Sequence, residues 1–178
     1  MKTKLVVATA MVALVLSFAA QNAVASAKRP KTLQDRVTHE LNMLPYVNTF
    51  DYMAFTVDDN GTVTLTGDVT NATLKSDAGN VVKKVEGVER VDNQINVLPV
   101  SFMDQRLRAR LYRSIYGEPM LQRYAMGVNA QIRIIVDNGH VTLIGFVDNQ
   151  ADKIIAGMHA NSVPGIFSVD NQLKVVKG

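Results

Sequence analysis

One phrase occurs twice in this chain, and its repetition constrains the fold more than any other sequence feature. DNGTVTLTGDV begins at Asp59, and DNGHVTLIGFV begins 78 residues later, at Asp137. Compared without gaps, residues 59–98 and 137–176 are identical at 19 of 40 positions. Self-similarity over such a length marks a duplicated structural unit. The chain of 178 residues is therefore predicted to contain two copies of one small fold.

The residue pattern of each copy predicts the order helix, strand, strand, helix, strand. Helical spacing, strand-like alternation and turn dipeptides locate these elements. In the first copy, they are predicted near residues 32–44, 52–57, 63–69, 71–85 and 88–98. In the second copy, they are predicted near residues 103–116, 131–136, 140–147, 150–162 and 166–176.

This element order predicts the fold class α+β. We expect two tandem αββαβ domains, each with a small mixed three-stranded sheet and two helices on one face, because this arrangement buries both apolar faces. The domains are expected to span residues 28–99 and 100–178. Asn60-Gly61 suits a type I′ hairpin turn, since both residues tolerate positive φ.

Residues 1–27 have the composition of a cleaved export signal. Lys2 and Lys4 precede an apolar run over residues 5–20, and small residues at Ala25 and Ala27 suit cleavage. The run has 16 residues, fewer than the roughly 20 of a membrane span. The chain has no cysteine, which would exclude disulfides and a lipid-modified N-terminal cysteine. We therefore expect a periplasmic protein that is not a lipoprotein.

Glycine and asparagine residues recur at matched positions of the two copies. Glycine serves where the backbone needs positive φ or close packing, and asparagine can satisfy backbone groups beside a strand. We interpret the set as a structural motif that maintains the fold. Its members are Gly61, Gly67, Gly87, Asn93, Gly139, Gly145, Gly165 and Asn171.

The repeated motifs resemble those of tandem BON domains. VTLTG at 63–67 and GVERVDNQ at 87–94 match that pattern, as do VTLIG at 141–145 and GIFSVDNQ at 165–172. An export signal followed by two such domains is similar to osmotically inducible periplasmic proteins. The resemblance implies a family associated with envelope stress, proposed to bind phospholipid and without enzymatic activity. Some family members are outer-membrane lipoproteins, and this chain has no cysteine to carry the lipid.

No residue pattern in the chain indicates catalysis or a cofactor. His39, His140 and His159 fall on different predicted elements and lack the spacing of metal ligands. The sequence contains no cysteine nucleophile, serine elbow or phosphate-binding glycine loop. We therefore expect no enzyme activity, no metal and no cofactor.

The first helix of the second copy carries most of the excess positive charge. Residues 28–99 have a net charge of −2, and residues 100–178 have +3. At 100° per residue, Leu107, Leu111 and Ile115 form one stripe of that helix, opposite a basic cluster with tyrosines between them. Arginine suits phosphate, and tyrosine suits a bilayer interface. The candidate lipid-binding residues are Arg106, Arg110, Arg113, Tyr112 and Tyr116.

The roles of the arginines and of the apolar residues that follow this helix stay open at this point. The arginines could form only a solvated helix face. Met120, Leu121 and Tyr124 could add an apolar wedge to a lipid site, or could instead cover an interface between the copies.

The sequence favours binding of anionic phospholipid or a membrane surface, with support of envelope integrity under stress. The alternative is a protein-interaction or chaperone-like module that contacts envelope proteins without lipid. Nucleic-acid binding is disfavoured, because the chain from Lys28 carries a net charge of only +1.

Overall fold

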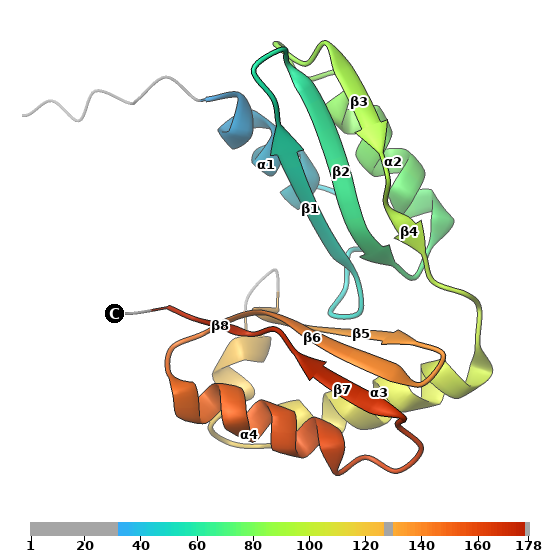
Figure 1. The fold of residues 1–178 in the computed structure, drawn as a ribbon, viewed down its shortest axis with the longest axis vertical. Helices are drawn as coiled ribbons and strands as arrows, with labels where there is room; N and C mark the ends of the chain where they lie inside the picture. Colours follow the sequence, from blue (N-terminus) through green and yellow to red (C-terminus); the bar gives the residue numbers. More distant parts are fainter. Residues whose placement is uncertain (1–31, 127–129, 177–178) are drawn as a thin grey trace, which may run out of the picture. The chain divides into compact units, whose positions relative to one another are not determined.

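The computed structural model describes residues 32–126 and 130–176, and Figure 1 shows its two copies of one α+β fold. The predicted export signal lies outside the described residues. Among the residues described, no helix combines the length and apolar character needed to cross a membrane.

The first copy contains two helices and a mixed sheet. Helix α1 spans Leu33–Asn42, strands β1 and β2 span Tyr52–Val57 and Thr62–Val69, and helix α2 spans Ala72–Val82. Strands β3, Arg90–Asn93, and β4, Asn96–Val97, complete the sheet. Antiparallel β1 and parallel β3 and β4 all pair with the central strand β2. Both helices cover the same face of this sheet (Figure 1).

The second copy repeats the arrangement. Its helices are α3, Phe102–Tyr116, and α4, Gln150–Asn161, with a short 3-10 helix η1, Gln122–Ala125. Strands β5, Ile132–Asp137, and β6, His140–Val147, are antiparallel. Strands β7, Ser168–Asn171, and β8, Lys174–Val175, pair in parallel with β6. The predicted fold class and tandem arrangement are therefore confirmed.

The predicted last strand of each copy is divided into two short strands, a detail that the sequence analysis missed. In the first copy, Asn93 Oδ1 accepts the backbone N–H of Ile95 at 3.3 Å. The same bond joins Asn171 to Leu173 in the second copy. Because the side chain takes this N–H, strand pairing is interrupted there, and each sheet gains a fourth strand.

The two β-hairpins end in different turns. In the first copy, Asp58 Oδ1 accepts the N–H groups of Asn60 and Thr62, and only Gly61 has positive φ, +75°. In the second copy, Asn138 and Gly139 have φ of +50° and +80°, which fits a type I′ turn. The prediction of a type I′ turn at Asn60-Gly61 is thus wrong. The Asp58 side chain stabilises a wider turn instead.

Each copy has its own hydrophobic core between helices and sheet. In the first copy, the buried side chains include Val37, Leu65 and Ile95. In the second, they include Leu107, Leu143 and Leu173. Each of the four α-helices described also has a side-chain N-cap. Thr32 forms a capping box with Asp35, and Ser101 accepts the N–H of Asp104.

Candidate functional site

Helix α3 separates a buried stripe from an exposed basic face. Leu107, Leu111 and Ile115 are fully buried in the core of the second copy. Arg106, Arg110 and Arg113 are exposed on the other side of the helix. The helical periodicity of the sequence placed these three arginines on one face, and the structure brings them together there.

The three arginines of this basic face have few protein partners. The guanidinium of Arg106 lies 4.6 Å from the ring centroid of Phe102. Arg110 Nη1 donates to the carbonyl oxygen of Pro164 at 3.4 Å. Within residues 32–126 and 130–176, none of the three forms an ion pair. Their positive charge is therefore available to an anionic ligand.

Two other arginines of this region serve the fold. Arg108 is buried, and its Nη2 donates to the carbonyl oxygen of Val136 at 2.6 Å. Burial lowers the pKa of Arg108, while the neighbouring carboxylate of Asp104 opposes that shift. Arg123 pairs with Asp148 at 3.2 Å and with the buried Asp152.

The two candidate tyrosines are in contact but differ in exposure. Tyr112 is 41% exposed beside the basic face, and its ring lies 4.9 Å from that of Tyr116. Tyr116 is buried, and its hydroxyl donates to the carbonyl oxygen of Ile132 at 2.6 Å. A membrane surface could therefore reach Tyr112, whereas Tyr116 belongs to the core.

The buried phenol of Tyr116 predicts a loss of stability in alkali. Burial raises its pKa above the ordinary value of about 10, so the unfolded chain releases this proton first. The free energy of unfolding should then fall as the pH rises above about 10. In Tyr116→Phe, that fall should be smaller by up to about 1.4 kcal/mol per pH unit. Urea unfolding of both proteins at pH 8 and pH 11 measures the difference, and equal losses would contradict it.

The residues suggested as an apolar wedge are mostly in the core. Leu121 and Tyr124 are buried, and Met120 remains 48% exposed. Tyr124 hydroxyl donates to Asp152, a fully buried residue that occupies the core position of Leu74 in the first copy. Asp152 also accepts from Asn149 Nδ2 at 2.9 Å. This network fixes η1 against α4.

Sequence comparison of the two copies contained a signal for this network. An acid replaces a core leucine at an aligned position, and a buried acid needs a partner. Tyr124 and Arg123 could not be named as partners, because they lie in the loop between α3 and β5, which is longer than the matching loop of the first copy.

The repeated glycines and asparagines lie at turns and strand contacts. All six glycines have positive φ, between +75° and +132°. Asn93 Nδ2 donates to Lys75 O, and Asn171 Nδ2 donates to Lys153 O, both at 2.7 Å. These bonds tie each second helix to the last strand of its sheet. We assign these residues to the scaffold.

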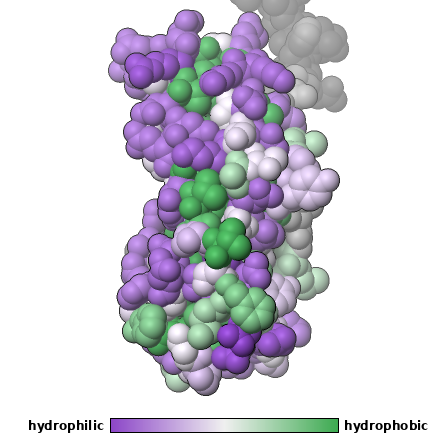
Figure 2. All heavy atoms as spheres, turned by 90° about the vertical axis from the view of Figure 1, so that its right-hand side faces the viewer, coloured by the Kyte–Doolittle hydropathy of each residue, from purple (hydrophilic) through white to green (hydrophobic). Residues whose placement is uncertain are grey.

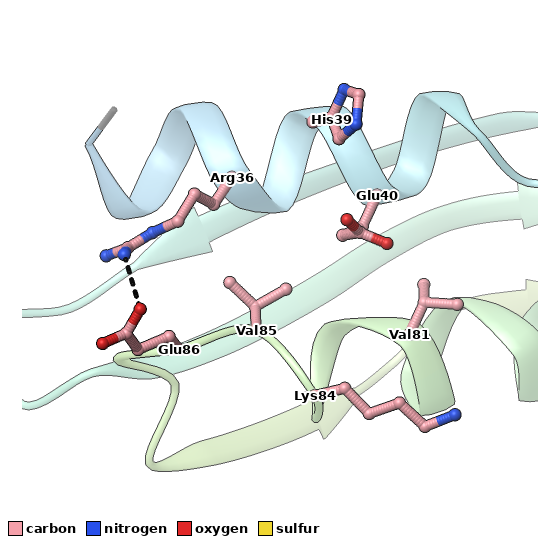
Figure 3. Close-up of a pocket in the computed structure, with 7 residues that line it drawn as sticks. All are labelled: Arg36, His39, Glu40, Val81, Lys84, Val85 and Glu86. Atoms are coloured by element: carbon pink, nitrogen blue, oxygen red, sulfur yellow. Dashed lines mark ion pairs between the residues drawn. The ribbon is translucent and has the colours of Figure 1, made fainter. Parts of the chain in front are cut away.

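A groove with a volume of about 560 Å³ lies between α1 and α2 (Figure 3). Charges of both signs line it, and Arg36 pairs with Glu86 at 3.5 Å across its end. The two basic and two acidic side chains that line the groove balance, so it has no net charge to attract an ion. Across the part of the chain described, no three acidic or histidine side chains gather as a metal site would require.

Comparison with known proteins identifies the fold. The BON domain model matches residues 31–99 and again residues 104–177. The chain belongs to the BON domain family. Its two copies correspond to these two matches, and the resemblance drawn from the motifs is confirmed.

A curated relative of this BON protein is the outer membrane lipoprotein DolP of Haemophilus influenzae. The two are 30% identical over 122 residues, which cover 68% of this chain and 60% of DolP. The chain thus matches less than two thirds of the length of that relative. DolP also corrects the expected localisation. Our exclusion of a lipoprotein rested on the missing cysteine, and a relative that is an outer membrane lipoprotein overturns it.

Two solved structures of CdsD, a structural protein of the type III secretion system of Chlamydia trachomatis, also resemble the chain. They share 14% and 16% identity with it, cover 82% and 83% of it, and are themselves covered to 93% and 99%. Their TM-scores are 0.34 and 0.32, too low to support an argument about this BON protein.

Proposed function

We propose that this BON protein binds the surface of anionic phospholipid membranes and supports envelope integrity under osmotic or other stress. It acts by binding rather than by catalysis. One observation carries the proposal. The face of α3 formed by Arg106, Arg110 and Arg113 is exposed, and none of these arginines has an ion-pair partner among the described residues. Guanidinium groups match phosphate because they donate parallel hydrogen bonds.

The matching helix of the first copy lacks this character. On α1, Arg36 is paired with Glu86, and the neighbouring positions are His39 and Glu40. The charge difference between the halves, −2 against +3, points the same way. The second BON domain is therefore the one that would meet an anionic surface. The name of DolP, an outer membrane lipoprotein, also supports a membrane role.

Co-sedimentation with vesicles tests the proposal. The purified protein should bind phosphatidylglycerol-containing vesicles and leave pure phosphatidylcholine vesicles unbound. Binding should weaken as salt rises, because the Debye length falls from about 30 Å at 0.01 M to about 10 Å at 0.1 M. Each basic residue near an anionic surface contributes about 1 kcal/mol, so reversing Arg106, Arg110 and Arg113 to Glu should weaken binding at least about 100-fold.

A charge-matched control separates this face from net charge. Lys83, Lys84 and Arg90 are exposed in the first BON domain, and their reversal to Glu changes the total charge equally. The control should keep most of the binding. Equal losses in both variants would contradict the assignment to α3. A protein that binds no vesicles but suppresses aggregation of an unrelated client would instead be an interaction or chaperone-like module.

A further inference from the structure

The second BON domain differs from the first at one end of its sheet. Leu107 is the sixth residue of α3, whereas its counterpart Leu33 is the first residue of α1. Each lies beside the matched glycine, Gly165 or Gly87, so the two leucines are equivalent in space. Helix α3 thus has more than one extra turn at its start. That turn carries Phe102 and Met103, which are 71% and 55% exposed.

The loop between α4 and β7 adds a third exposed apolar side chain. Phe167 occupies the place of Glu89 in the first copy. The N–H of Phe167 donates to Gly139 O, and the N–H of Glu89 donates to Gly61 O, both at 2.9 Å. Both copies therefore keep this backbone bond, and an aromatic ring that is 78% exposed stands where the first copy has an acid.

A buried carboxylate joins the extra turn to this loop. Asp104 accepts the N–H of Asn138 at 3.0 Å and the N–H of Gly139 at 2.9 Å. The ring of Phe167 packs directly on Gly139. The start of α3 and the α4–β7 loop are consequently fixed to the same turn. We call Phe102, Met103 and Phe167 the apolar tip.

The apolar tip is continuous with the basic face of α3. Arg106 lies over the Phe102 ring and places Nη2 3.8 Å from Met103 Sδ. Arg110 contacts the α4–β7 loop through the carbonyl oxygen of Pro164. Figure 2 shows hydrophobic and hydrophilic side chains side by side on the lower, second-copy part of the molecule. Exposed aromatic rings next to cations are typical of proteins that enter the bilayer interface.

We propose that the apolar tip inserts between the headgroups of an anionic bilayer, with Arg106 and Arg110 bound to the surrounding phosphates. The inference rests on the proposed function and adds the orientation of the domain and a contact from the α4–β7 loop. Charge complementarity identifies the occupant. The exposed charged groups of α3 are all arginines, and Asp104 is buried with both carboxylate oxygens bonded to the turn.

Single tryptophans provide a direct test, because the sequence contains none. Phe167→Trp reports on the apolar tip, and Glu89→Trp reports on the equivalent backbone position of the first BON domain. With phosphatidylglycerol-containing vesicles, Trp emission at position 167 should shift to the blue, resist iodide and be quenched by brominated acyl chains. The variant at position 89 should show none of these changes.

The outcomes separate the two proposals. If the position-167 variant co-sediments with vesicles while its emission and iodide access stay unchanged, the insertion of the tip is refuted and lipid binding stands. Equal blue shifts at positions 89 and 167 would also refute it. If neither variant nor the unmodified protein co-sediments, both proposals fail together.

A second pair of variants measures affinity. Phe167→Glu gives the second copy the residue of the first, and burial of one phenylalanine side chain predicts at least about tenfold weaker vesicle binding on its loss. Glu89→Phe should add no comparable affinity, because the first copy has no adjoining basic face. Unchanged binding of Phe167→Glu would overturn the insertion.

Discussion

Replacement of Asp104 by alanine should destabilise the second BON domain by about 3 kcal/mol, because it removes the acceptor of two backbone N–H groups in the β5–β6 turn. It also removes a negative charge that favours the buried Arg108 cation. A buried donor that loses its partner costs about 1–3 kcal/mol, more than a lost surface ion pair. Urea unfolding followed by circular dichroism measures the loss.

Two further variants locate the cause of this loss. Asp104→Asn keeps an acceptor oxygen and removes the charge, so its effect should lie between those of aspartate and alanine. Gln105→Ala changes the exposed neighbour and should stay within about 0.5 kcal/mol of the unmodified protein. Amide exchange at Asn138 and Gly139 should accelerate only in the Asp104 variants. A loss below about 1 kcal/mol for Asp104→Ala would show that water replaces the carboxylate.

A comparable effect is expected for Gly145→Ala in the central strand of the second sheet. Gly145 has φ of +132°, and a Cβ there would collide with the carbonyl oxygen of Gln131. The strained backbone and the backbone overlap together should cost about 3 kcal/mol or more. For a domain of this size, each kcal/mol lowers the melting temperature by about 4–8 °C. Calorimetry should therefore show the second domain melting well before the first.

Gly67 offers the matched test in the first copy. Its φ is +122°, and its Cβ would collide with the carbonyl oxygen of Tyr52. Gly67→Ala should lower the stability of the first domain by a similar amount. Phe146→Ala, next to Gly145 and 55% exposed, should be nearly neutral. A neutral Gly145→Ala would mean that β5 and β6 separate there at little cost.

Much of this fold could be predicted because local and repeated signals agree. Thr32 and Asp35 mark a helix start, and alternation from Val63 to Val69 marks a half-buried strand, without reference to distant residues. Because of the duplication, the pattern of each element could be checked in two copies of the sequence. The split of the last strand escaped prediction, because it depends on one side-chain bond from Asn93 to Ile95.

The candidate site was predictable only where helical geometry decides exposure. Periodicity placed Arg106, Arg110 and Arg113 together, and the same geometry places Arg108 near Ile115 on the buried side. The apolar tip could not be predicted from periodicity, because Phe102 and Phe167 lie on segments far apart in sequence. The bonds of Asp104 and of the Phe167 N–H to the β5–β6 turn bring those segments to one place.

Glu89 and Phe167 donate equivalent backbone hydrogen bonds, to Gly61 and Gly139 respectively. This equivalence has a consequence for how the surfaces of such a duplicated protein diversify. Since each bond uses only backbone atoms, it does not depend on which side chain occupies this position. One copy can keep a negative residue there while the other acquires an aromatic ring, and neither exchange alters the bond. Duplication thus leaves the architecture conserved in both halves and lets specificity evolve in one of them.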